Sequence, residues 1–476
     1  MIPIINHSLN NSIVHADWKK ARVTPIFKGG ETANIHNPSD YRPISVICHI
    51  AKLVEKLVKV QLDFLTIHDF ITSDQSAYLK AHSTVTCLHR IMDNWLENIN
   101  ENDFSGICML DITKCFDSIN HKLLLQKLDC YGIRDKANAW FESYLSHRTQ
   151  AVYCNGSLSD FLGNPFGVPQ GSVLGPILFL IFVNDVVNCS SRDNVINLFA
   201  DDVLSGVSDS SPSEVKLKLD HNLSLLADWY SKNRLKLHPK KTKFMMVGSN
   251  AQLSQIFSPL TMKQGDSDVV VSDFVEYLGL IIEPNLSFDR HVSEVVRKLN
   301  YQSSILSNLA KYCSRNLLLT YYKAFIQPRI DYGISVWGCT STKNLAKVQR
   351  VQNRIARIIC NDFDYRNTRG LDLLKDLKLY NVTQRRDYFL TKIMFESVRG
   401  LAPSYLVNAV TMKIDVHGHN TRRPDDVYLP TIKNELYRNS LLYSGGKLFN
   451  DLPPHIKLAS DIDDFKKKYF NFIHNS

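Results

Sequence analysis

Closely spaced cysteines are absent from this chain of 476 residues. Its ten cysteines are scattered, none of them stands in a C-x-x-C pair, and no group of cysteine and histidine has the spacing of a zinc site. These absences argue against a zinc module and against a disulfide framework. We therefore expect reduced thiols, mostly packed as small apolar residues, in a protein of the cytosol or nucleus.

Long hydrophobic runs are absent as well. The longest apolar stretch extends from Val173 to Val183 and is interrupted by Gly175 and Pro176, so it is too short to cross a bilayer and predicts a buried helix. Residues 1–20 lack the basic leader and apolar run of a signal peptide. We expect a soluble protein of the nucleus and cytoplasm, with no membrane partner.

The composition is that of an ordinary globular protein, with 44% hydrophobic and 22% charged residues. No internal repeat or low-complexity tract is present, and the length suits two or three domains. The net charge of +9 and the pI of about 8.9 favour polyanionic partners, because binding to phosphates releases counterions. This excess is weak evidence alone, since many basic proteins bind no nucleic acid.

Hydrophobic periodicity divides the chain near residue 285. Before that point, apolar runs predict strands over 21–27, 106–110, 151–153, 244–247 and 275–282, and helical spacing predicts helices over 46–65, 83–99, 120–131 and 212–229. After it, helices are predicted over 291–312, 317–326 and 343–359. We expect domains at 1–285, 286–415 and 416–476, the last poorly patterned.

Two acidic motifs stand at the ends of apolar strands. The strand that ends at Leu110 delivers Asp111, as metal-assisted phosphoryl transfer requires, although an Asp that caps the next helix is the better explanation of this motif alone. Asp201 and Asp202 lie in a turn between two apolar arms, where a bound cation would relieve their repulsion. The alternative is a simple turn, because aspartate suits turns.

A glycine-rich loop lies between the two acidic motifs, from Gly167 to Pro176. Its glycines allow the backbone to approach a nucleotide closely, and Gln170 offers an amide to a sugar or base. Ser172 and Pro176 are suitable residues for the start of a helix. For a lone loop, an ordinary entry into a buried helix is the better explanation.

The order of these three elements resembles motifs A, B and C of the polymerase palm. The chain is similar to the reverse transcriptases of non-LTR (LINE-type, jockey-like) retrotransposons over Leu110 to Asp117, Gly167 to Pro176 and Phe199 to Asp202, with Phe199 where tyrosine is more usual. Flanking segments of the same family are matched at residues 18–28, 41–45, 235–242 and 277–279. The resemblance is strong over the first 285 residues and loose over the helical remainder.

This resemblance implies an α/β (α+β) right-hand polymerase with fingers and an antiparallel palm, followed by a helical thumb and a C-terminal extension. It implies RNA-directed DNA synthesis, in which dNTPs are joined to the 3′-hydroxyl of a DNA primer at the target DNA along an RNA template. Asp111, Asp201 and Asp202 would be the catalytic residues and would hold two Mg²⁺ ions, for which Mn²⁺ could substitute. The sequence does not indicate an oligomeric state.

The resemblance also assigns a nucleotide pocket. Phe116 falls at the steric gate, where its ring would exclude a ribose 2′-hydroxyl, while Gln170 and Gly171 would line the pocket. Asp117 is expected to support the structure and not to bind metal. Lys28, Arg42 and Lys80 are expected to contact the phosphates from the fingers, although each could instead be a solvated surface charge. Lys241 is expected near the pyrophosphate, with a lysine-rich strand entry as the alternative.

The chain departs from the family in its fingers. The usual Gln-x-Gly-Phe-Arg reads Gln75-Ser76-Ala77-Tyr78-Leu79 here, so Leu79 replaces the arginine expected at the triphosphate. The first matching motif already lies inside the fingers, which predicts an N-terminally truncated copy without an endonuclease domain. A weak or inactive copy that only binds nucleic acid is therefore the alternative function. An RNA-dependent RNA polymerase is a second alternative, against which Phe116 argues.

The helix predicted over 343–359 has two unlike faces. Leu345, Val348, Ile355 and Ile358 form an apolar face, and Lys347, Arg350, Arg354 and Arg357 form a basic one. The basic face would lie against a template–primer duplex if this helix belongs to a thumb. A solvated face over a core is an equally good interpretation.

Overall fold

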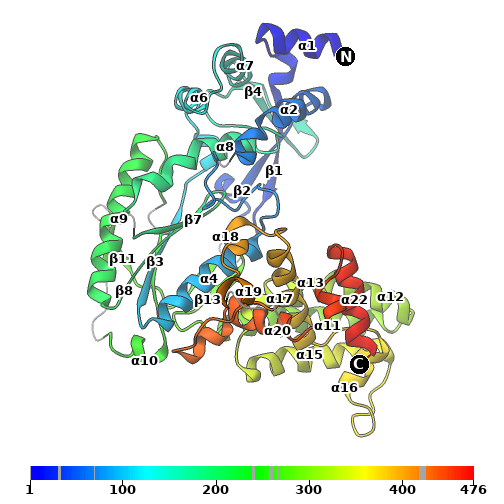
Figure 1. Ribbon diagram of the computed structural model, residues 1–476. Coiled ribbons are helices and arrows are strands. Elements are labelled where there is room, and N and C mark those ends of the chain that lie inside the picture. The colour runs from blue at the N-terminus through cyan, green and yellow to red at the C-terminus, as the bar shows by residue number, and fades with distance from the viewer. Residues whose placement is uncertain are drawn as a thin grey trace.

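The computed structural model describes residues 2–29, 34–68, 70–191, 193–238, 242–256, 261–264, 267–417 and 425–475. Figure 1 shows a mixed α/β molecule in which two sheets lie in the N-terminal part and the C-terminal helices gather beside α4 (Thr84–Asn100). This architecture agrees with the α/β class expected from the sequence. None of the described helices is both long and apolar enough to cross a membrane.

The central sheet has the order β7-β8-β3-β9, and all its neighbours are antiparallel. Its strands are β7 (Val195–Phe199), β8 (Asp202–Asp209), β3 (Phe104–Asp111) and β9 (Lys243–Val247). Both faces are buried, because alternate residues of β3, β8 and β9 enter two different cores. This burial explains why the strands read as almost continuous apolar runs in the sequence.

Helices cover each face of the central sheet. Cys108 and Leu110 pack in a first core with α8 (Gly175–Val183) and α9 (Pro212–Lys232), whereas Ile107 and Leu204 pack in a second core with α4. Gly106 lets α9 approach closely, since a Cβ there would lie 2.3 Å from Val215. Apart from Pro176, every residue of α8 is buried, which confirms the helix predicted from this apolar stretch.

A second sheet lies at the N-terminal end of the molecule. Its strand β1 (Lys20–Phe27) pairs antiparallel with β2 (Tyr41–Val46) and parallel with β4 (Thr149–Cys154). The short strands β5 (Ser157–Leu158) and β6 (Leu162–Gly163) pair with β4. The helices of this region are α1 (Ile2–Asn11), α2 (His49–Leu62), α6 (His121–Cys130) and α7 (Asp135–Leu145).

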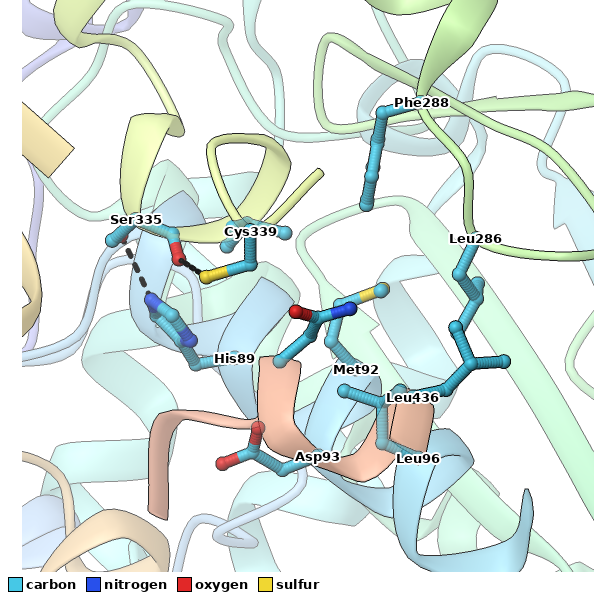
Figure 2. Close-up of a pocket in the computed structure, with 11 residues that line it drawn as sticks. His89, Met92, Asp93, Leu96, Leu286, Phe288, Ser335, Cys339 and Leu436 are labelled. Atoms are coloured by element: carbon cyan, nitrogen blue, oxygen red, sulfur yellow. Dashed lines mark hydrogen bonds between the residues drawn. The ribbon is translucent and has the colours of Figure 1, made fainter. Parts of the chain in front are cut away.

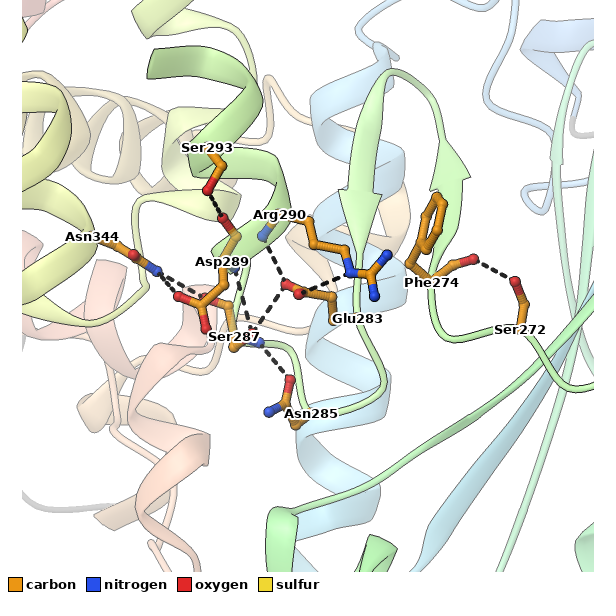
Figure 3. A network of polar contacts seen from close by, with 9 residues as sticks. All are labelled: Ser272, Phe274, Glu283, Asn285, Ser287, Asp289, Arg290, Ser293 and Asn344. Carbon is orange, nitrogen blue, oxygen red and sulfur yellow. Dashed lines mark hydrogen bonds and ion pairs between the residues drawn. The ribbon is translucent and has the colours of Figure 1, made fainter. Parts of the chain in front are cut away.

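A hairpin leads from the sheets into the helical part. Strands β12 (Val275–Tyr277) and β13 (Leu280–Ile282) are joined by Leu278 and Gly279, both of which have positive φ, as a tight hairpin turn requires. The polar contacts that follow are drawn in Figure 3, where Glu283 accepts from Ser287 and the side chain of Asn344 donates to Asp289 over 2.7 Å. These contacts fix the start of α11 (Asp289–Leu309) against α15 (Thr342–Cys360).

The C-terminal part is helical, as predicted. α12 (Arg315–Tyr321) continues through a π-helical turn, Tyr322–Ile326, into α13 (Gln327–Asp331). After α15, the longest helices are α17 (Val382–Val398) and α22 (Ile462–Asn475). Residues between 380 and 469 supply most of a third core, which joins α17 to α22. The domain boundaries expected at 285 and 415 stay a prediction.

The two faces of α15 differ from the prediction at one residue. Its four apolar residues, Leu345, Val348, Ile355 and Ile358, are buried as expected. The assignment of Arg357 to an exposed basic face is wrong, because Arg357 is only 5% exposed and donates to backbone carbonyls between residues 362 and 368. The loop after α15 folds back over this guanidinium, which helical periodicity could not indicate.

Candidate active site

The three aspartates predicted to be catalytic lie at one end of the central sheet. Strand β3 ends at Asp111 and β8 begins at Asp202, and these two residues are direct partners in the antiparallel register. Ala200 and Asp201 form the tight turn between β7 and β8, and Ala200 has a φ of +54°. The sheet therefore holds all three backbone positions on rigid elements.

The side chains of the trio divide between the two faces of the sheet. Asp111 and Asp202 are paired across the strands, so their side chains leave the same face, which is also that of Leu204. Asp201 lies on the side of Cys115: burial is the main cause of the raised pKa of the Cys115 thiol, and the Asp201 carboxylate raises it further. Burial also raises the pKa of Tyr78, with a smaller contribution from Asp201.

The fit of the trio to metal ions can be judged from this placement. Carboxylates at the ends of adjacent strands are the hard oxygen ligands that Mg²⁺ prefers. Within the described parts of the chain, however, no three Asp, Glu, His or Cys side chains are grouped closely enough to hold an ion. The backbone and the donor chemistry therefore fit such a site, while the side chains would have to rotate for the three carboxylates to converge.

Phe116 lies on α5 (Cys115–Ser118), directly after β3. Its ring is half-buried and stacks on Phe179 of α8, with 4.7 Å between the centroids and 20° between the planes. Gly167 passes under the same backbone, where a Cβ would come within 2.7 Å of the Phe116 carbonyl oxygen. Phe179 of α8 thus packs on the Phe116 ring, while the glycine-rich loop packs on its backbone.

Gln170 and Gly171 are held between α5 and β2. The Gln170 side-chain nitrogen donates to both carboxylate oxygens of Asp117, each over 3.1 Å, while its backbone carbonyl accepts from the Ser45 backbone nitrogen over 2.6 Å. Gly171 has a φ of +112°, and a Cβ on it would lie 2.7 Å from the Ser45 carbonyl oxygen. Asp117 therefore orients Gln170, and only glycine suits the next position.

A buried glutamate that the sequence analysis did not identify fixes the start of α8. Glu55 of α2 is 2% exposed and accepts from the backbone nitrogens of Val173 and Leu174, over 2.6 and 3.2 Å, and from the Tyr144 hydroxyl over 3.0 Å. Burial raises the pKa of Glu55, although these donors oppose the rise. The sequence could have indicated Glu55, because a charged residue there lies between Val54 and Val58 on the buried stripe of α2.

The basic residues expected at the phosphates lie on the surface where they are described. Arg42 of β2 and Lys80 are exposed, and the Lys28 ammonium donates to the Ser39 carbonyl over 2.7 Å. Lys241 lies outside the described residues. Leu79 packs against the first core, so the side chain that replaces the family's arginine contributes to packing. Phosphate contacts by these residues stay predictions.

A family model described as reverse transcriptase (RNA-dependent DNA polymerase) matches residues 27–282, which is more than half of the chain and includes Asp111, Asp201, Asp202 and the glycine-rich loop. This chain belongs to the reverse transcriptase family. Its antiparallel central sheet is the palm of a right-hand polymerase. The fold expected from the resemblance is confirmed.

Relatives of this reverse transcriptase occur in mobile elements. It is 28% identical over 401 residues to the probable RNA-directed DNA polymerase from transposon BS of Drosophila melanogaster, covering 80% of this chain and 42% of the relative. It is 26% identical over 433 residues to the RNA-directed DNA polymerase from mobile element jockey of the same species, covering 85% and 45%. The chain thus spans less than half the length of both, and the expected resemblance to jockey-like enzymes is confirmed.

A solved structure is also similar to this reverse transcriptase. Apo telomerase from Candida tropicalis aligns with a TM-score of 0.44 and 15% sequence identity, over 82% of this chain and 69% of that one.

Proposed function

We propose that this chain is an RNA-directed DNA polymerase of a non-LTR retrotransposon, which joins dNTPs to a primer 3′-hydroxyl along an RNA template. The observation that carries the proposal is the direct pairing of Asp111 with Asp202 next to the Asp201 turn, within a reverse transcriptase domain. The primer is the target DNA, and the enzyme acts in the nucleus and cytoplasm. The basic net charge of +9 supports nucleic-acid partners.

Asp111, Asp201 and Asp202 would hold two Mg²⁺ ions, with Mn²⁺ as a possible substitute. Bound ions of this kind assist the loss of the primer hydroxyl proton and neutralise charge on the leaving pyrophosphate. The chain itself orients the nucleotide: Gln170, fixed by Asp117, and Gly171 line the pocket. Arg42, Lys80 and Lys241 contact its phosphates.

The sugar of the incoming nucleotide is selected by Phe116. The stack on Phe179 limits the movement of its ring and the loop at Gly167 packs against its backbone, which supports a gate that admits deoxyribose and rejects a 2′-hydroxyl. An RNA-dependent RNA polymerase needs room for that hydroxyl. Phe116 therefore favours dNTPs over rNTPs as substrates.

Primer extension on poly(rA)/oligo(dT) with Mg²⁺ and dTTP tests the proposal. Asp201→Asn keeps the shape but removes a negative ligand, so the rate should fall at least about a thousand-fold, which corresponds to roughly 4 kcal/mol of lost transition-state stabilisation. Asp193→Asn, at an exposed aspartate just before β7, is the matched control and should extend like the parent chain. Extension by Asp201→Asn within about ten-fold of the parent would reject Asp201 as a metal ligand.

A copy that binds nucleic acid without polymerising is the second candidate function. The observations that favour it are the divided carboxylates and Leu79, which packs in the core where an arginine would reach the triphosphate. Such a chain would bind poly(rA)/oligo(dT) with an affinity that falls steeply with salt and would extend no primer. Binding and extension measured on the same preparation separate the two candidates.

A further inference from the structure

A short segment of the fingers lies along the outer strand of the palm. The Ser76 backbone nitrogen donates to the Leu198 carbonyl, and the Leu198 nitrogen donates to the Asp74 carbonyl, each over 2.8 Å. Gln75 and Leu198 form an isolated parallel bridge. We call residues 74–77 the strap, and it covers the edge of β7 just before the catalytic turn.

The side chain of Gln75 connects the strap to that turn. Its carbonyl oxygen accepts from the Ala77 backbone nitrogen over 2.8 Å and from the Ala200 backbone nitrogen over 3.1 Å. Ala200 is the turn residue with positive φ, and Asp201 follows it directly. A non-glycine residue in this conformation is held by its surroundings. The bond from Gln75 therefore reaches the backbone that orients Asp201 and Asp202.

The buried side chain of Gln75 has one polar atom that is unpaired within the part of the chain that the structure describes, which indicates that its role goes beyond packing. Gln75 is 1% exposed, and its side-chain nitrogen has no hydrogen-bond partner among the described residues. A buried donor without a partner is unfavourable, so an apolar side chain of the same length would serve packing alone better. The carbonyl bonds to Ala77 and Ala200 are the interactions that such a side chain would lose.

The strap is braced by a residue far along the chain. Asp74 forms an ion pair with Arg90 of α4, and Arg90 also donates to the Ser73 carbonyl over 2.9 Å. The Arg90 guanidinium lies 5.0 Å from the ring centroid of Tyr405, whose hydroxyl is 3.4 Å from that of Ser76. Tyr405 belongs to α18 (Ser404–Val407), which lies beside α4 in Figure 1 and outside the family match at 27–282.

We propose that Gln75 is a positioning residue for the catalytic turn, and that Tyr405 stabilises the strap on which Gln75 lies. The C-terminal helical region thereby influences the geometry of Asp201 and Asp202. This inference rests on the proposed polymerase function. It assigns a task to a part of the chain that the family match does not include.

The first test replaces Gln75 by Met, which keeps the length and removes the acceptor. The kcat of primer extension should fall about ten-fold while the KM for dTTP changes less than about two-fold, because the turn moves and the nucleotide pocket does not. The Ala200 amide should exchange with deuterium faster, and exchange across α9 should stay unchanged if the fold is intact. Gln75→Glu keeps an acceptor and should retain the protection of Ala200.

Matched controls separate position from chemistry. Gln255→Met makes the same change at an exposed glutamine and should alter neither kcat nor exchange at Ala200. Should Gln75→Met fail to fold, Gln75→Asn replaces it, since the shorter amide stays polar but cannot reach Ala200. For the brace, Tyr405→Leu should speed exchange at Ser76 and Leu198 and lower kcat. Tyr312→Leu, at a tyrosine that is 88% exposed, should change neither.

Each outcome decides one part of the inference. Unchanged kcat and unchanged Ala200 exchange in Gln75→Met would overturn the role of Gln75. Unchanged deuterium exchange at Ser76 and Leu198 in Tyr405→Leu would show that the C-terminal region does not stabilise the strap. If the parent chain extends no primer, the proposed function fails, whereas exchange at Ala200 still shows whether Gln75 holds the turn.

Discussion

At the Phe116 ring, the proposed selection of the sugar and the packing of the core would both use an aromatic side chain. Its stack on Phe179 contributes to the first core, and its place directly after β3 brings it to the palm end that carries Asp111. A half-buried ring can serve both purposes, because only one of its edges has to face the nucleotide. Substitution can separate the two roles, since they predict different measurements.

Phe116→Val should relax the choice of sugar. The smaller side chain leaves room for a 2′-hydroxyl, so the ratio of kcat/KM for dTTP over UTP should fall at least about ten-fold, equivalent to roughly 1.4 kcal/mol. Primer extension with each nucleotide on poly(rA)/oligo(dT) measures the ratio. Phe64→Val, at another half-buried ring beside the same core, is the matched control. An unchanged ratio of kcat/KM in Phe116→Val would show that Phe116 contributes to packing and does not select the sugar.

At the scale of elements, α2 and α8 are joined by one buried carboxylate. Glu55 accepts the first free backbone N–H groups before α8, a place where a helix start leaves donors without intrahelical partners. The same carboxylate accepts from Tyr144 of α7. The fingers helix thus positions the helix that follows the glycine-rich loop, and through it the Phe179 ring under Phe116.

Glu55→Leu should lower the free energy of unfolding by roughly 2–4 kcal/mol, because two backbone N–H groups and one hydroxyl lose their acceptor inside the core. Urea denaturation followed by circular dichroism measures the change. Glu142→Leu makes the same substitution at an exposed glutamate of α7 and should shift stability by less than about 0.5 kcal/mol. Equal effects of the two substitutions would contradict a specific role for Glu55.

The elements themselves could largely be predicted from the sequence. Apolar runs mark β3, β7 and β8, and helical spacing marks α4, α9 and α15, because each buries a regular face. The turn at Ala200 and Asp201 fixes the register of β7 with β8, whereas the pairing of Asp111 with Asp202 joins β3 to β8 and no local pattern sets it. That Asp111, Asp201 and Asp202 belong to one site was expected from the resemblance to the polymerase palm, and their catalytic roles stay predictions.

Contacts between distant segments could not be predicted in this way. The bond between Gln75 and Ala200 joins residues 125 positions apart, and no local pattern marks either partner. Arg357 shares the period of the exposed basic residues of α15, yet the loop that follows buries it. Periodicity describes one element at a time. The burial and the hydrogen-bond partners of these side chains depend instead on other segments that pack against that element.

At the scale of the whole molecule, α4 connects the palm to the C-terminal region. Figure 2 shows His89 and Asp93 of α4 beside Ser335 and Leu436, which come from the helical part. The His89 ring lies 2.8 Å from the Ser335 hydroxyl, and burial lowers the pKa of His89 to about 3. Asp93 accepts from the Leu441 backbone nitrogen over 2.8 Å. Two ionisable groups thus lie inside the contact between the palm and the helices.

Asp93 should make this contact weaker as pH rises. Burial is the main cause that raises the pKa of Asp93 from 3.8 to about 7, with a small contribution from Glu97, although backbone donors at Leu441 and Leu442 oppose the rise. Because the pKa is higher in the folded chain, the folded state binds the proton more tightly than the unfolded state. The contribution of Asp93 to stability is therefore complete below the unfolded pKa and is lost as pH rises through the folded pKa.

Asp93→Asn removes this titration and keeps an oxygen that can accept from Leu441. The free energy of unfolding of the variant minus that of the parent should increase between about pH 4 and pH 7 and then stay level. The increase should reach a few kcal/mol, since each tenfold change in proton affinity corresponds to about 1.4 kcal/mol. His89 titrates alike in both chains, so its opposite effect cancels. Asp160→Asn, at an exposed aspartate, is the matched surface control. A difference for Asp93→Asn that does not vary with pH would contradict the raised pKa of Asp93.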